Sequence, residues 1–149
     1  MGMRELLEKL AVKSPLRKEG DHYVMRVRDD EFIHFTPSKH ALGIIKSKKL
    51  LKDPPYEKFG PDLVYAISLT FGSAFAGVQT THLPADSGEI VALRFKTNTV
   101  PKIGFSEEVS WDKDVALKNV LLVPMGVAMS MLKKTPYRLE NDQKYVKYL

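Results

Sequence analysis

Residues 32–51 read FIHFTPSKHALGIIKSKKLL, and this stretch predicts a strand that passes directly into a helix. The apolar run 32–35 has the composition of a short buried strand, with His34 inside it. Thr36 is a favoured N-cap and Pro37 a favoured first helical residue, so we expect the helix to begin there. Helical spacing should turn these residues inward: Ala41, Leu42, Ile44 and Ile45.

The same order of elements recurs further along the chain. A loop rich in proline and glycine, residues 52–61, precedes the short apolar run 63–67, which we interpret as a buried strand. Apolar residues then recur at helical spacing between Phe71 and Val78, which predicts a second helix packed on a sheet. Two strand–helix units are therefore expected in the first half of the chain.

Outside these units, strand patterns dominate. Period-two alternation predicts half-buried strands at 22–28 and 91–96, a shared face for Val109 and Trp111, and one long strand over 115–123. A first helix is expected at 4–13 and a short helix near 127–132, followed by a polar tail whose last residues should fray. The fold class is α+β with a mostly antiparallel sheet.

Composition bounds the remaining possibilities. The chain has 149 residues and 44% hydrophobic content, which suits a single domain over 1–149, with 1–20 as a helical cover and 125–149 as a C-terminal extension. Cysteine is absent, so disulfides and thiolate metal sites are excluded and we expect no bound metal. No apolar run could span a bilayer, and we expect a soluble, cytoplasmic protein with no membrane partner.

The net charge of +5 allows a nucleic-acid or acidic partner without identifying one. The densest basic group comprises Lys46, Lys48, Lys49 and Lys52. A solvated helix end explains this group by itself, because lysines complement the partial negative charge of a helix C-terminus.

The common phosphate-binding and hydrolase motifs are missing, which leaves single residues near predicted strands as candidates: His34, Tyr65 and the pair Glu107-Glu108. In this order they resemble the His-Tyr-Glu branch of the ADP-ribosyltransferases, which includes diphtheria-toxin-like and poly-ADP-ribose-polymerase-like enzymes. The resemblance runs from FIHFTPSKHALGIIKSKKLL through LVYAISLTFGSAFAGV, residues 63–78, to GFSEEVSWDKDVALKNVLLVP, residues 104–124.

The resemblance implies a split, mostly antiparallel sheet with flanking helices and NAD as co-substrate. His34, acting as a donor, and the Thr36 hydroxyl would then hold the ribose of NAD. Tyr65 and Phe75 would sandwich the nicotinamide ring. Glu108, or alternatively Glu107, would stabilise the positive charge that develops on the sugar as nicotinamide leaves. The activity implied is transfer of one ADP-ribose unit to a protein or nucleic-acid acceptor.

Two alternatives stay open. The Arg-Ser-Glu branch of the same family would use Arg26 or Arg28 on a strand, with Ser68 on the next strand as a further NAD contact, although its usual Glu-x-Glu is missing. A small basic protein that binds a nucleic acid or another partner, without chemistry, also fits the charge and size.

Overall fold

The computed structural model describes residues 2–3, 17–20, 22–52, 63–70, 72, 88–103, 108–133 and 146–149. Its elements in chain order are β1 (Arg17–Glu19), β2 (His22–Met25), the 3-10 turn η1 (Val27–Asp29), β3 (Phe32–Pro37), α2 (Ser38–Ser47), β4 (Lys49–Leu50), β5 (Val64–Ser68), β6 (Ile90–Lys96), β7 (Lys102–Ile103), β8 (Glu108–Trp111), β9 (Val115–Ala116), β10 (Lys118–Pro124), α3 (Met125–Lys133) and β11 (Val146–Tyr148). The helix expected at 4–13 lies outside the described residues. So does the helix expected at 71–78, apart from Gly72.

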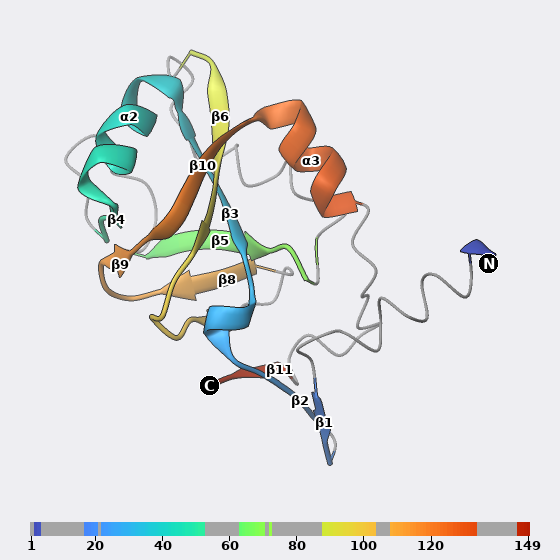
Figure 1. Ribbon diagram of the computed structural model, residues 1–149. Helices are drawn as coiled ribbons and strands as arrows, with labels where there is room; N and C mark the ends of the chain where they lie inside the picture. Colours follow the sequence, from blue (N-terminus) through green and yellow to red (C-terminus); the bar gives the residue numbers. More distant parts are fainter. Residues whose placement is uncertain are drawn as a thin grey trace.

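The fold is mixed α+β with a mostly antiparallel sheet, as the sequence predicted. Within the described residues the main sheet has the order β10-β6-β3-β5-β8-β7, and each of these pairings is antiparallel. Figure 1 shows β3, β6 and β10 running steeply while β5 and β8 run across them, so the sheet turns sharply between β3 and β5. β3 therefore occupies the centre of the sheet, beside this turn.

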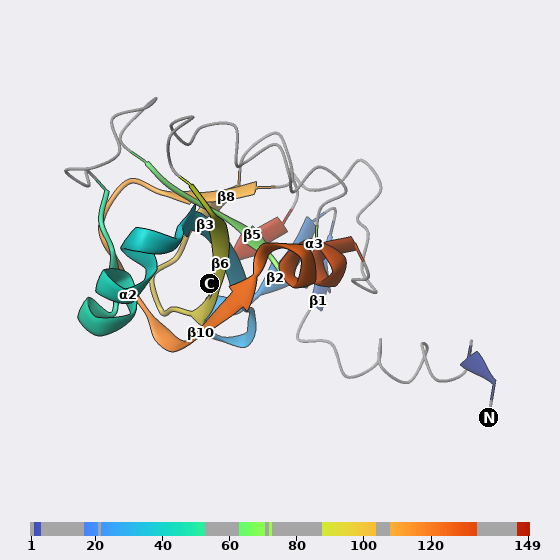
Figure 2. The same ribbon diagram turned by 90° about the horizontal axis from the view of Figure 1, so that it is seen from above.

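Alternate residues of β3 belong to two separate hydrophobic clusters. Phe32 packs in the larger cluster, with Trp111 and Phe95, and α2 contributes Ala41 and Ile44 to it. Ile33 and Phe35 pack in the smaller cluster, to which α3 contributes its buried residues Ala128 and Leu132. Because successive strand residues point to opposite faces, α2 and α3 cover opposite faces of the sheet. Figure 2 shows the two helices on either side of β6.

The junction between β3 and α2 differs from expectation by one residue. Pro37 still pairs with Ile90 in the ladder between β3 and β6, and the helix begins at Ser38, with Pro37 in the N-cap position. The Thr36 hydroxyl therefore makes no capping hydrogen bond to the first turn of α2. The backbone N–H of Ser38 donates instead to the Glu89 carbonyl at 2.8 Å. Leu42, expected to face inward, is 59% exposed, because the buried stripe of α2 consists of Ala41 and Ile44.

Three further expectations about strands need correction. The strand predicted at 22–28 ends at Met25, because η1 follows it. The strand predicted to be half-buried at 91–96 is β6, which is buried on both faces, since Ala92 is fully buried as well. The long strand predicted at 115–123 is divided at Leu117. Its first part, β9, pairs with β4, and its second part, β10, forms an edge of the main sheet. Edge position explains why Leu121 and Leu122 are 57% and 56% exposed.

The last residues of the chain were predicted to fray, but they form the strand β11. β11 lies parallel to β2, with Val146 opposite Tyr23 and Tyr148 opposite Met25. Backbone bonds continue this pairing, because Leu149 N–H donates to the Met25 carbonyl at 2.9 Å and Val27 N–H donates to the Leu149 carbonyl at 3.0 Å. Tyr148 itself is buried against Phe32. Both α3 and β11 therefore belong to the core packing, although both fall in the region expected to be an extension.

Candidate functional site

His34 lies where the ladder between β3 and β5 stops. The two strands pair only at Phe32↔Ser68 and Ile33↔Ile67, and the next pair in this register would be His34↔Ala66. Beyond this point the His34 side chain connects the two strands in place of a backbone ladder, because its Nδ1 lies 2.7 Å from the Tyr65 carbonyl oxygen. The imidazole thus links the two diverging strands and fixes the place at which the sheet splits.

The protonation state of His34 follows from this contact. A carbonyl oxygen only accepts hydrogen bonds, so Nδ1 carries a proton and donates it to Tyr65. Burial lowers the pKa of His34 below its ordinary value, and the hydrogen bond to the Tyr65 carbonyl opposes this only in part. The ring is therefore neutral at neutral pH, and Nε2 is an acceptor. The sequence predicts that His34 donates to a ribose hydroxyl; in this structure its Nδ1 proton goes to the Tyr65 carbonyl instead.

Tyr65 and Glu108 lie on the neighbouring strands β5 and β8. Tyr65 pairs with Ser110 and Ile67 pairs with Glu108, so Tyr65 and Glu108 leave the same face of this strand pair two positions apart. Both residues are half-buried. The pKa of Tyr65 is raised, first by burial and second by the negative charge of Glu108, so the phenol stays protonated at neutral pH. The structure therefore brings the Tyr65 and Glu108 side chains together on the face that Ile67 shares. The His34 side chain leaves β3 on the face of Phe32, which is the opposite one, and meets this pair only through the Tyr65 main chain.

Thr36 and Ser68 have different surroundings. The Thr36 side chain is fully buried, and its hydroxyl oxygen has no hydrogen-bond partner. Ser68 is also buried, but its hydroxyl donates to Asp30 Oδ2 at 2.5 Å and accepts the backbone N–H of Thr70 at 3.1 Å. Ser68 is thus engaged in a network of its own, away from His34. Phe75 and Glu107 lie outside the described residues.

Asp30 is a buried carboxylate for which the sequence pattern gives no signal. Besides Ser68 it accepts the Tyr148 hydroxyl at 2.7 Å, the Thr70 hydroxyl at 2.8 Å and the Glu31 backbone N–H at 2.8 Å. Burial nevertheless raises its pKa, and these hydrogen bonds offset the rise in part. Asp30 joins the start of β3, the end of β5 and β11, and so stabilises the strand ends that flank the candidate site.

The arginines of the alternative branch do not lie on strands. Arg26 sits between β2 and η1 and Arg28 lies within η1, and both are exposed. The arginine that does lie beside β3 is Arg94 of β6, which forms an ion pair with Glu31. The Arg94 side chain is therefore already paired with the Glu31 carboxylate. The sequence pattern gives no signal for this pair.

No group of histidine and carboxylate side chains in the described ranges is arranged to hold a metal ion. Among the described residues, no helix is long and apolar enough to cross a membrane. Searches against protein-family models, curated proteins and solved structures found no match. Function is therefore inferred from the site geometry and the sequence resemblance.

Proposed function

We propose that the chain is an NAD-dependent mono-ADP-ribosyltransferase, with NAD as co-substrate and nicotinamide as a product. The observation that carries the proposal is the order β3-β5-β8 in the sheet, which sets His34, Tyr65 and Glu108 on three neighbouring strands. The resemblance assigned His, Tyr and Glu to three core strands of a split antiparallel sheet. The short ladder between β3 and β5 supports that finer fold assignment as well.

Each of these groups, taken by itself, offers a contact that suits the sugar or the ring of NAD. In the neutral His34 ring, Nε2 accepts a hydrogen bond, and a ribose hydroxyl is a suitable donor. The buried Thr36 hydroxyl lacks a partner, and a second ribose hydroxyl would satisfy it once the site opens to the ligand. The protonated Tyr65 offers an uncharged aromatic face to the nicotinamide ring. Phe75, on the other side of that ring, stays a prediction.

Glu108 supplies the charge that the reaction needs. The bond between the nicotinamide nitrogen and the sugar carbon breaks, and its electron pair leaves with nicotinamide. Positive charge develops on the sugar, and a fixed carboxylate stabilises it. The acceptor's nucleophilic atom then bonds to the same carbon, and its proton passes to a carboxylate. Glu107 stays the alternative to Glu108, and the acceptor is a macromolecule, either protein or nucleic acid.

The test measures nicotinamide release from NAD by Glu108→Gln, Glu107→Gln and the double variant. Loss of a transition-state electrostatic contact should lower the rate about 10²- to 10³-fold in the variant of the true catalytic glutamate, while NAD still raises the melting temperature. Glu89→Gln is the matched control, because Glu89 is an exposed carboxylate at the start of β6. Full release by the double variant overturns the mechanism. Absence of both release and thermal stabilisation by NAD overturns the function.

A further inference from the structure

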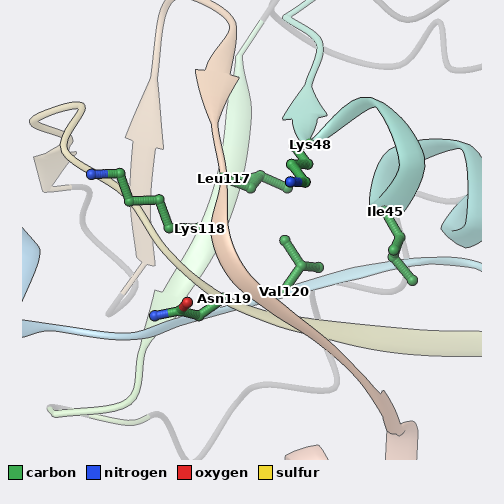
Figure 3. A pocket seen from close by; sticks show the side chains of 6 residues that line it. All are labelled: Ile45, Lys48, Leu117, Lys118, Asn119 and Val120. Carbon is green, nitrogen blue, oxygen red and sulfur yellow. The ribbon is translucent and has the colours of Figure 1, made fainter.

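A pocket of about 490 Å³ lies between the end of α2 and the start of β10, and its lining residues are Ile45, Lys48, Leu117, Lys118, Asn119 and Val120. Figure 3 shows Ile45 and Lys48 on the α2 side and Lys118 and Asn119 on the opposite side, with Leu117 and Val120 between them. The pocket shares no residue with the group His34, Tyr65 and Glu108. Its chemistry is half apolar and half cationic or amide.

Lys48 occupies a backbone conformation that favours glycine. It is the C-cap of α2, with φ 56° and ψ 36°, in the left-handed region. Two backbone hydrogen bonds hold it there: its N–H donates to the Ile44 carbonyl at 2.8 Å, and its carbonyl accepts the Leu117 N–H at 2.8 Å. The left-handed C-cap thus satisfies a carbonyl at the end of α2, but glycine would do so without the strain that a lysine side chain adds.

Asn119 repeats this conformation on the other side of the pocket. Its φ is 52°, and it lies where the ladder between β10 and β6 shifts between Lys118 and Leu121. In the described part of the chain, Lys48 and Asn119 are the two residues other than glycine with positive φ, and both line this pocket. Strained backbone conformations concentrate at functional sites, and asparagine tolerates this one better than lysine. Lys48 is thus the more informative of the two.

The charges around the pocket are not neutralised locally. Lys48 and Lys118 are exposed, and neither forms an ion pair or a side-chain hydrogen bond with another described residue. Lys46 and Lys49 add two more exposed cations beside Lys48. The segments 38–52 and 113–124 carry one carboxylate, Asp114, which accepts the backbone N–H of Lys52 at 2.9 Å. The helix dipole accounts for the charges of Lys46 and Lys48 at the end of α2, but it does not account for that of Lys118, which lies on a strand.

We propose that this pocket and the lysines around it bind consecutive phosphates of a nucleic-acid backbone. Several separate ammonium groups suit a row of anions, and lysine binds phosphate as a point charge. Segments 38–52 and 113–124 contain no arginine, so the contacts to the phosphates are point-charge contacts without the planar, bidentate geometry of a guanidinium. They also contain no phenylalanine, tyrosine or tryptophan on which bases could stack, so we expect binding to be independent of base sequence. Ile45 and Val120, which are both half-buried at the pocket, contact the sugar.

The test uses fluorescence anisotropy with a short labelled DNA duplex of mixed sequence, over a series of salt concentrations. Lys48→Gly should keep or raise the melting temperature, because glycine adopts this φ without strain. It should nevertheless bind DNA at least about threefold more weakly at low salt. Its slope of log K against log salt should be smaller in magnitude by about one.

Two matched controls separate charge from backbone effects. Asn119→Gly relieves the same backbone strain without loss of charge, so its affinity should stay within about twofold of wild type. Lys133→Ala removes an exposed charge from α3, on the opposite face of the sheet, and should have little effect. Glu108→Gln should bind DNA normally, which makes this test independent of the proposed enzyme activity.

Three results would overturn the proposal. One is an unchanged affinity and salt slope for Lys48→Gly. Another is a loss in Lys133→Ala as large as that in Lys48→Gly, since net charge alone would then explain binding. The third is polyglutamate binding as tight as duplex binding, which would point to an acidic protein partner instead.

Discussion

Replacing Tyr148 with phenylalanine would remove one hydroxyl group from the interior and keep the aromatic ring. That hydroxyl donates to Asp30 Oδ2 at 2.7 Å, and Tyr148 and Asp30 are only 6% and 1% exposed. The ring lies 6.0 Å from that of Phe32, and phenylalanine preserves this packing. The variant therefore isolates a single hydrogen bond to a buried carboxylate.

The expected cost can be worked from the partners that stay in place. A hydrogen bond to a charged group contributes about 1.5–3 kcal/mol to the free energy of unfolding. Asp30 keeps its donors from Ser68, Thr70 and Glu31, so we expect a loss of about 2 kcal/mol, in the lower half of that range. For a domain of this size, such a loss lowers the melting temperature by roughly 4–8 °C.

The cost should also depend on pH. Burial raises the pKa of Asp30 in the folded protein above its ordinary value of 3.8. The contribution of this shift to stability is fully present below the pKa that Asp30 has in the unfolded chain, and it is lost as pH rises through the pKa that Asp30 has in the folded protein. The Tyr148 hydroxyl offsets that loss, because it stabilises the ionised carboxylate. The penalty of Tyr148→Phe is therefore largest at neutral pH and shrinks as pH falls through the folded pKa of Asp30.

Urea unfolding followed by circular dichroism, at neutral and at mildly acidic pH, measures this difference. Thr70→Val is a useful comparison, because it removes a hydroxyl from the other carboxylate oxygen without touching β11. Only Tyr148→Phe should also speed hydrogen exchange at the Val27 amide, which β11 protects through Leu149. A penalty below about 0.5 kcal/mol, or one that is equal at both pH values, would refute the reasoning.

Three other predictions concern His34, the sheet core and the sheet edge. Nitrogen NMR should find the His34 ring neutral at neutral pH with its proton on Nδ1, and a doubly protonated ring would contradict this. Because burial lowers the pKa of His34, the free energy of unfolding of the wild type should decrease as pH falls below about 6.5, whereas that of His34→Phe should not show this decrease. Ile33→Ala should lower the free energy of unfolding by about 2–5 kcal/mol, because Ile33 is fully buried and the smaller side chain leaves a cavity. A smaller loss would mean that the neighbouring core side chains move in to fill this cavity. Leu122→Lys should change it by less than about 0.5 kcal/mol and reduce self-association in light scattering, since Leu122 is exposed on an edge strand; a larger destabilisation would show that the residue is buried.

Local patterns in the sequence were sufficient for the central strands. Residues 32–35, 63–67 and 91–96 formed strands as predicted, because apolar runs and alternation report burial directly. The start of α2 was misplaced by one residue, because Pro37 stays paired with Ile90 and tertiary pairing overrides a local N-cap signal. The exposure of Leu121 depends on which strand takes the edge, and periodicity carries no information on strand order.

Residue type and order selected the residues of the candidate site but carried no information on their contacts. His34, Tyr65 and Glu108 could be selected from residue type and order, and their neighbouring strands agree with that choice. The bond from His34 to a main-chain carbonyl leaves no trace in the residue pattern, so the acceptor role of Nε2 could not be foreseen. The Asp30 network was missed for a related reason, since Tyr148 is 118 residues away from Asp30 in sequence.

That separation has a consequence for the order of events during protein synthesis. At about 5–20 residues per second, Tyr148 leaves the ribosome roughly 6–24 s after Asp30. During this interval the Asp30 carboxylate cannot be buried with all of its donors, and burying a charge without them is unfavourable. The strand ends around Asp30 should therefore stay solvated until Val146–Tyr148 arrives. A nascent chain halted before these residues should show greater protease sensitivity at β2 and η1 than one that includes them.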